Sequence, residues 1–246
     1  MSGKSIALVT GGARGIGFAC GEALAEDGHF VILADIQGAE EAAGKLGGAG
    51  YTCDMSDPDA VLSLFDRIEA EHGPVSVLVN NAGMAKAAPF LEMTLEDFKA
   101  VIDLNLTAVF VATQRAARTM VERGIEGAIV NMSSVNAQLA IPSIAGYCAS
   151  KGGVMQLTKV AALSLAEKGI RVNAVGPGSI DTAMLAGVNS DAAAMARVMS
   201  RTPLKRVGTP REIGDVVAFL ASKKASYITG ETIYVDGGRL GLNYTV

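Results

Sequence analysis

Short runs of consecutive apolar residues alternate along the chain with longer segments whose apolar positions recur at helical spacing. Strands that are apolar on successive positions are typical of a parallel sheet covered on both faces. Helices between such strands make right-handed crossover connections, so the pattern predicts a doubly wound α/β fold. The predicted strands are Ile6–Thr10, Phe30–Asp35, Gly50–Asp54, Val75–Asn80, Ala128–Ser133, Arg171–Val175 and Thr232–Asp236. The predicted helices are Ile16–Asp27, Asp57–Glu71, Leu95–Arg123, Gly146–Glu167 and Pro210–Ser222.

No linker or repeat divides the chain, so we expect a single domain over residues 1–246 with about seven parallel strands and helices on both faces. The alternation is interrupted at residues 181–205, where Met184, Met195 and Met199 indicate a short amphipathic helix or flap. In doubly wound sheets, ligands bind beyond the carboxyl ends of the strands. We therefore expect residues 181–205 to form a flap over a substrate.

The composition excludes several classes of protein. With 21 basic and 25 acidic residues, the formal charge of −4 disfavours nucleic acid or an anionic membrane as a partner. No uncharged apolar stretch reaches the roughly 18 residues that a membrane span needs. Its cysteines, Cys20, Cys53 and Cys148, lack a C-x-x-C spacing, which indicates a reducing compartment. We expect a cytoplasmic protein with a small-molecule substrate.

The two histidines are poorly placed for chemistry. His29 follows Asp27-Gly28 and His72 precedes Gly73-Pro74, so both are expected to be solvated loop residues. A histidine metal site and a Ser-His-Asp triad are therefore disfavoured, and we expect no metal. If the chain is an enzyme, a different side chain must move the proton.

A glycine-rich turn follows the first predicted strand and opens the first helix. Gly11, Gly15 and Gly17 allow a tight turn and the close approach of a pyrophosphate to the helix N-terminal amides. Asp35 ends the second strand, where a carboxylate can accept hydrogen bonds from ribose hydroxyls. This context indicates a Rossmann-type dinucleotide site. The structural alternatives are an ordinary β–α turn and, for Asp35, a strand-terminal cap.

Polar residues also follow the third and fourth strands. Asp54 either contacts an adenine or caps the helix that starts near Asp57. Asn80 and Asn81 either take part in the site or satisfy backbone groups in a turn.

The fifth strand ends in Ser133-Ser134, and the next helix carries Tyr147 and Lys151. Tyr147 and Lys151 are four residues apart, so they share one helix face. An ammonium beside a phenol favours the phenolate and lowers the pKa of Tyr147, which makes an acid/base without histidine. The Ser134 hydroxyl can hold a carbonyl or carbinol oxygen. The alternative is a Tyr and a Lys that are buried for packing.

In combination, these motifs resemble the short-chain dehydrogenase/reductase family over nearly the whole chain. The resemblance implies that Asn105, Ser134, Tyr147 and Lys151 form a catalytic tetrad. Ser134 is preferred to Ser133 because the family places its serine 13 residues before the tyrosine. The resemblance rests on Thr10-Gly11-x-x-x-Gly15-x-Gly17, Asn80-Asn81-Ala82-Gly83, Asn105, Ser134, Tyr147-x-x-x-Lys151 and Gly176-Pro177-Gly178.

The resemblance also implies a set of cofactor contacts and a homotetramer. Lys151 would hold the nicotinamide ribose, and Asn105 would position a water for proton relay. The implied contacts are Gly11, Arg14, Gly15, Ile16, Gly17, Asp35, Asp54, Met55, Asn81, Ala82, Gly83, Tyr147, Lys151, Pro177, Gly178, Ile180 and Thr182.

The substrate is the least defined part. Members of the family bind their substrate through segments after Gly83, after Ser134 and in the flap. In this sequence these segments include Met84, Lys86 and Ile141. We expect Lys86 to be a solvated loop lysine. The mixture of methionines and amides permits a polyol, a ketone or a 3-oxoacyl thioester. The expected substrate contacts are Ser134, Asn136, Gln138, Tyr147 and Met184.

Two residues act in opposite directions on the choice between NAD and NADP. Arg14 could pair with a 2′-phosphate, whereas the Asp35 carboxylate repels it. Because an exposed ion pair contributes only about 0–1 kcal/mol, Asp35 predicts NAD. The leading prediction is an NAD-dependent dehydrogenase acting on a secondary alcohol or ketone. A regulator that binds the dinucleotide without turnover, and an epimerase or dehydratase, rank below it.

Overall fold

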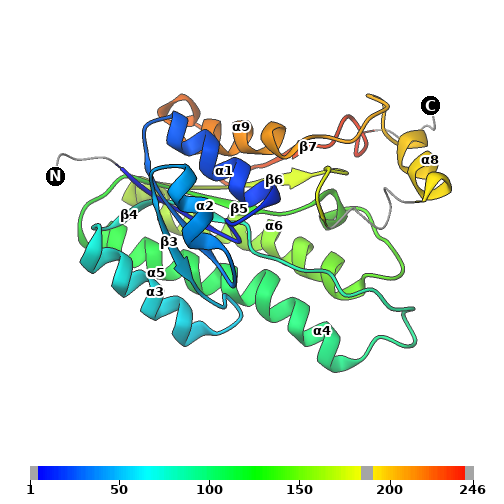
Figure 1. Cartoon of the computed structure of the whole chain (residues 1–246), viewed down its shortest axis with the longest axis horizontal. Helices are drawn as coiled ribbons and strands as arrows, with labels where there is room; N and C mark the ends of the chain where they lie inside the picture. Colours follow the sequence, from blue (N-terminus) through cyan, green and yellow to red (C-terminus); the bar gives the residue numbers. More distant parts are fainter. Residues whose placement is uncertain (1–4, 184–190, 242–246) are drawn as a thin grey trace.

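A computed structural model of the chain describes residues 5–183 and 191–241 (Figure 1). Within these ranges seven strands form one parallel sheet in the order β3-β2-β1-β4-β5-β6-β7. The strands are β1 (Ile6–Thr10), β2 (Phe30–Asp35), β3 (Ala49–Thr52), β4 (Val75–Asn80), β5 (Gly127–Met132), β6 (Ile170–Pro177) and β7 (Thr232–Val235). The helices used below are α1 (Gly15–Glu26), α2 (Ala39–Lys45), α3 (Pro58–Glu71), α4 (Leu95–Ile102), α5 (Ala108–Glu122), α6 (Ala145–Leu165), α8 (Ala192–Ser200) and α9 (Pro210–Ala221).

Helices cover both faces of the sheet (Figure 1). Helices α1, α2 and α9 bury apolar side chains against one face, and α3, α5 and α6 against the other. Local sequence explains where several of them begin. Asp57 caps α3 by accepting from the N–H groups of Asp59 and Ala60, and Thr209 forms a capping box with Glu212 at the start of α9. The predicted doubly wound α/β fold is confirmed.

The predicted strands are confirmed with shifts of no more than two residues at their ends. β3, for example, is Ala49–Thr52 rather than Gly50–Asp54. Helix α2 was missed between the second and third strands. It has only seven residues, it follows Gly38 in the left-handed conformation, and it buries only alanines, so it carries little hydrophobic periodicity.

The helix expected over Leu95–Arg123 is not a uniform α-helix. It consists of α4, a five-residue π-helical segment (η1, Asp103–Thr107) and α5. π-Helical turns inside α-helices occur frequently at functional sites, and this one contains Asn105. In the predicted flap, α8 accounts for residues 192–200, while Met184 lies outside the described residues.

The prediction that both histidines are solvated is wrong. His29 is half-buried, with a buried Nδ1, and burial lowers the pKa of His29. The His72 ring lies 5.1 Å from Phe30 between ring centroids, and its Nε2 is 2.9 Å from the Tyr51 hydroxyl. The glycine turns beside His29 and His72 therefore do not leave the two rings in solvent.

Two negative findings hold for the described part of the chain. Among residues 5–183 and 191–241, no helix has the length and apolarity needed to cross a membrane. The same residues contain no cluster of three or more His, Cys, Asp or Glu side chains that could hold a metal ion.

Candidate active site

The glycine turn after β1 brings the chain very close to the start of α1. Gly11 and Gly15 have positive φ angles of 61° and 55°, which favour glycine. A Cβ on Gly17 would lie 2.0 Å from the Gly11 carbonyl oxygen and 2.6 Å from Asn81 Nδ2. Only glycine fits at position 17, which is buried where α1 packs against the turn.

The loop after β4 braces this turn. Asn81 Nδ2 donates to the carbonyl oxygens of Thr10 (3.0 Å) and Gly11 (2.9 Å). Thr10 Oγ1 in turn accepts from the backbone N–H groups of Asn81 and Ala82, both at 3.1 Å. Asn80 lies apart from the site, because its amide is buried and donates to Asn131 Oδ1 at 2.8 Å. Asn81, Ala82 and the glycine turn therefore form one connected structure, at the point where strand order reverses around β1 and β4.

The N-terminus of α1 has no side-chain cap. The N-cap residue Arg14 is exposed and makes no side-chain capping bond, and no acidic residue lies in the first turn. By contrast, Asp57 and Thr209 cap α3 and α9. Thr182 Cγ2 lies 3.6 Å from the position of a Cβ on Gly15, so the loop after β6 faces the same turn. First-turn amides without a cap fit a pyrophosphate.

Two acidic residues follow the adjoining strands. The Asp35 carboxylate accepts from the backbone N–H groups of Ala13 (3.0 Å) and Ile36 (2.8 Å), which fixes it beside the glycine turn. Asp54 is exposed and accepts from Ser56, while Asp57 caps α3, so Asp54 is not the helix cap.

The remaining predicted cofactor contacts lie on the same edge. Pro177 ends β6, and the N–H of Gly178 donates to the Val235 carbonyl oxygen at 3.0 Å. Ile180 is buried, and the Met55 side chain is buried in the core, which leaves only the Met55 backbone for a ligand.

Lys151 and Tyr147 lie one turn apart on α6, as predicted. Lys151 is 4% exposed, its Nζ donates to the Met132 carbonyl oxygen at 2.7 Å, and Nζ lies 5.6 Å from the Tyr147 ring centroid. Burial lowers the pKa of Lys151 to about 8. The predicted lowering of the Tyr147 pKa by Lys151 is not found. Burial raises the pKa of Tyr147, and a hydrogen bond with Ser134 opposes that shift.

The two serines after β5 have different partners. Ser133 Oγ donates to the Lys151 carbonyl oxygen at 3.1 Å and so joins β5 to α6. Ser134 Oγ accepts from the Asn136 N–H at 3.1 Å and is the hydroxyl that interacts with Tyr147. This arrangement agrees with the choice of Ser134 over Ser133.

Asn105 reaches the loop after β4 from the π-helical segment. It is fully buried, its Oδ1 accepts from the Met84 N–H, and its Nδ2 donates to the Met84 carbonyl oxygen, both at 2.9 Å. Nδ2 also donates to Ser150 Oγ at 3.1 Å, and Ser150 donates to the Tyr147 carbonyl oxygen at 2.8 Å. Ser150, which sequence reasoning missed, thus connects Asn105 to the helix turn of Tyr147.

Comparison with known proteins identifies the family of the chain. The family model described as enoyl-(acyl carrier protein) reductase matches residues 11–239, which is most of the chain. The chain belongs to the short-chain dehydrogenase/reductase family. It is 41% identical over 242 residues to cis-4-hydroxycyclohexanecarboxylate dehydrogenase of Sinomonas cyclohexanicum, covering 96% of each protein. It is 43% identical over 231 residues to the 3-oxoacyl-[acyl-carrier-protein] reductase MabA of Mycobacterium tuberculosis, covering 94% of this chain and 91% of the relative.

A solved structure of the family has the same fold. The gluconate 5-dehydrogenase from Burkholderia cenocepacia, in complex with NADP and tartrate, superposes with a TM-score of 0.92 at 35% identity, covering 98% of this chain and 97% of that one. The protein is therefore an oxidoreductase that acts on alcohol CH–OH groups or the corresponding ketones, with a nicotinamide dinucleotide as cofactor.

In this short-chain dehydrogenase, the residues predicted to contact substrate are partly engaged with one another. Gln138 Nε2 donates to the Tyr234 hydroxyl at 2.9 Å, an interaction that the sequence did not indicate. Asn136 Oδ1 is buried without a hydrogen-bond partner among the described residues. Lys86 is a loop lysine with a side chain that is 42% exposed, as expected, and it forms an ion pair with Asp97 at the start of α4 at 2.5 Å. Met184 lies outside the described residues.

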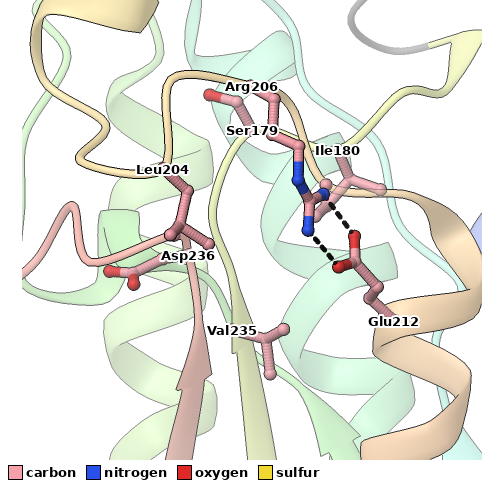
Figure 2. A pocket seen from close by; sticks show the side chains of 9 residues that line it. Ser179, Ile180, Leu204, Arg206, Glu212, Val235 and Asp236 are labelled. Carbon is pink, nitrogen blue, oxygen red and sulfur yellow. Dashed lines mark hydrogen bonds and ion pairs between the residues drawn. The ribbon is translucent and has the colours of Figure 1, made fainter.

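Figure 2 shows a separate cavity of about 80 Å³ at the carboxyl ends of β6 and β7. Arg206 and Glu212 form a bidentate ion pair across one side of it, at 2.8 and 2.6 Å. Ser179 and Asp236 also line the cavity, and none of Ser134, Tyr147 or Lys151 does. It is too small for a dinucleotide.

Proposed function

We propose that this enzyme transfers a hydride between NAD(H) and a small secondary alcohol or ketone, with Asn105, Ser134, Tyr147 and Lys151 as its catalytic residues. The observation that carries the proposal is the convergence of Tyr147, Ser134 and Lys151 at the carboxyl end of β5. Bound there, the nicotinamide supplies the hydride acceptor or donor. These side chains have the donors and the acid/base group that a proton transfer needs.

Each of these four side chains has a proposed role in the reaction that its contacts support. Tyr147 exchanges the proton with the carbinol or carbonyl oxygen, because burial holds its phenol neutral and ready to donate. Ser134 holds the same oxygen by hydrogen bonding. Lys151 binds the nicotinamide ribose through its buried Nζ, which lies 5.6 Å from the centroid of the Tyr147 ring. Asn105 positions a water. Ser150 is a positioning residue, because it connects Asn105 to the backbone of Tyr147.

The dinucleotide is proposed to lie across the predicted set of contacts, with the pyrophosphate at the α1 N-terminus. Asp35 supports NAD rather than NADP. Two backbone N–H groups fix its carboxylate, so it cannot turn away from a 2′-phosphate. Ile36 and Gln37 offer no cation to bind that phosphate. The gluconate 5-dehydrogenase crystal holds NADP, so the strictness of this preference needs a direct measurement.

We favour a polyol, sugar or similar small secondary alcohol as substrate. Two relatives are named for hydroxylated acids, cis-4-hydroxycyclohexanecarboxylate and gluconate. The buried Asn136 Oδ1 supports a substrate that offers a hydrogen-bond donor, such as a second hydroxyl.

A 3-oxoacyl thioester is the alternative substrate. An open apolar groove of about 450 Å³ favours it, since it could take an acyl chain. Ala87, Ala88, Pro89, Phe90, Pro142 and Ser143 line the groove.

The deciding experiment is a turnover screen of secondary alcohols, sugars and acetoacetyl thioesters, followed by the absorbance of reduced nicotinamide. We expect NAD-dependent oxidation of at least one secondary alcohol or polyol, and a large loss of kcat in Ser134→Ala. Preferential reduction of acetoacetyl thioesters would favour the alternative. Dinucleotide binding without any turnover would identify a regulator instead.

The proposal also includes the domain organisation and the location. Residues 1–246 form one cofactor-binding domain in a cytoplasmic protein, and residues 181–205 contact the substrate.

We propose that the protein is a homotetramer. Apolar side chains on the outer faces of two helices support self-association. Val160 and Leu163 on α6 are 53% and 83% exposed, and Phe110 on α5 is 47% exposed. Light scattering at micromolar concentration should give four times the monomer mass, and Leu163→Glu should lower it. A monomeric native protein would contradict this assembly.

A further inference from the structure

Two arginines lie together beyond the carboxyl ends of β6 and β7. Arg239 Nη1 donates to Ser179 Oγ at 3.1 Å, while its buried Nε has no partner among the described residues. Arg201 directly follows α8 and is exposed. Thr202, the residue after Arg201, has its Cγ2 2.8 Å from the position of a Cβ on Gly237, which places the end of α8 against the turn that carries Arg239. Burial and the charge of Arg201 both lower the pKa of Arg239.

This pair differs from Arg206 and Arg211, two arginines that also follow α8 along the chain. Arg206 is neutralised by Glu212, and Arg211 by Glu26 and Asp215. No ion pair with a carboxylate is found for Arg201 or Arg239 within residues 5–183 and 191–241. A half-buried cation beside a second cation is electrostatically costly unless an anion binds between them.

Asp236 is not the anion that neutralises the two arginines. Asp236 acts on Arg239 only at a distance, because its carboxylate accepts from the backbone N–H groups of Gly238 (2.8 Å) and Leu240 (2.6 Å). These bonds shape the turn after β7, whose Gly237 carbonyl oxygen accepts from the Leu204 N–H at 3.2 Å. The turn that carries Arg239 is therefore tied to the segment that follows α8, and the guanidinium keeps donors to spare.

The pair adjoins the proposed reaction site. Ser179 directly follows Pro177 and Gly178, which are proposed to contact the cofactor. β6 pairs with β5, and the Ser133 N–H donates to the Val175 carbonyl oxygen at 2.8 Å, so both strands end at one edge. Arg201 lies in the segment 181–205 that is proposed to contact the substrate. Gln138, four residues after Ser134, donates to the Tyr234 hydroxyl on β7, so the loop that carries Ser134 also contacts the strand that leads into the Arg239 turn.

We propose that Arg239 and Arg201, with the Ser179 hydroxyl, form a carboxylate-binding subsite that selects hydroxy acids or oxo acids as substrates. A guanidinium fork presents parallel N–H donors that match the two oxygens of a carboxylate. Ser179 orients Arg239 from one side, and Arg201 supplies a second charge from the end of α8. This inference deepens the proposed dehydrogenase activity and rests on it.

The test compares acids with their neutral esters. Kinetics are measured for 4-oxocyclohexanecarboxylate, levulinate and the corresponding hydroxy acids, each beside its methyl ester, in the native enzyme and in Arg239→Gln. In the acid–ester pair that the native enzyme uses best, kcat/KM should be higher for the acid than for its methyl ester. In Arg239→Gln, kcat/KM for the acid should fall roughly ten- to hundredfold through KM, and the ester should change less than twofold. Arg239→Lys should keep part of the preference.

Arg123→Gln is the matched control, since it removes one exposed arginine charge at the end of α5, outside residues 181–205 and without touching Ser179. It should leave both acid and ester kinetics unchanged. Equal losses for acid and ester in Arg239→Gln would show a structural role and overturn the subsite. A native enzyme that uses only the esters or other neutral ketones would also overturn it, while leaving the dehydrogenase assignment intact. Failure of every alcohol and ketone would instead refute the proposed function.

Discussion

Tyr147→Phe should lower kcat at least about a thousandfold while leaving the dissociation constant of the dinucleotide within twofold of the native value. Positioned acid/base groups contribute about 10²–10⁴ in rate, and here the phenol is the proposed proton donor and acceptor. The substitution removes one oxygen atom and keeps the ring against Lys151. Ser134 is the only side chain recorded among the described residues as a hydrogen-bond partner of that oxygen, so the loss should be catalytic rather than structural.

Stopped-flow fluorescence for cofactor binding and steady-state absorbance for turnover separate the two effects. Tyr227→Phe is the matched control, because that side chain is fully exposed and should change neither quantity. Lys151→Ala should lose both turnover and cofactor binding, since its Nζ is proposed to hold the nicotinamide ribose beside Tyr147. A near-normal rate in Tyr147→Phe would remove Tyr147 from the mechanism.

The pH dependence of the native enzyme gives a second readout of the same residue. Alcohol oxidation requires the phenolate, which accepts the proton, so the oxidation rate should rise with pH. Because burial raises the pKa of Tyr147, the rise should continue above the ordinary tyrosine pKa of about 10 when substrate and cofactor are limiting. Tyr147→Phe should abolish this rise in any residual activity.

The fold was largely predictable because its signals are local and repeated. Parallel strands buried on both faces read as apolar runs, and helix starts carry residues such as Asp57 and Thr209 that cap the backbone. The π-helical turn at Asn105 was not predictable, because it depends on the amide pairing with the Met84 backbone, a contact between distant segments. Helix α2 lacks periodicity and could not be distinguished from a loop.

The candidate site was predictable in its residue types but not in its electrostatics. Spacing placed Tyr147 and Lys151 on one helix face, and the structure agrees. Spacing could not give the depth of burial, which raises the Tyr147 pKa and lowers that of Lys151. Nor could it find Ser150 or Arg239, whose partners are 45 and 60 residues away along the chain. Such contacts exist only once the sheet has assembled.

The second large effect concerns the cofactor, where the native enzyme should show at least a tenfold higher kcat/KM with NAD than with NADP. A 2′-phosphate would lie against the Asp35 carboxylate, and such like-charge contacts cost several kcal/mol. Each 1.4 kcal/mol corresponds to about a tenfold change. Arg14 compensates little, because it is exposed and ion pairs in solvent contribute about 0–1 kcal/mol.

Replacing Asp35 by Ser and Ile36 by Arg should move the NAD/NADP ratio toward NADP by roughly a hundredfold or more, through the same charge terms. Serine can still accept from the Ala13 N–H, which keeps the turn in place, and Ile36 is 66% exposed, so an arginine fits there. The matched control is Asp54→Ser, which removes a carboxylate near the proposed adenine contact, a part that both cofactors share. It should change kcat/KM for NAD and NADP by the same factor. If the native enzyme already turns over faster with NADP, Asp35 does not govern the choice, and the charge at the α1 N-terminus outweighs it.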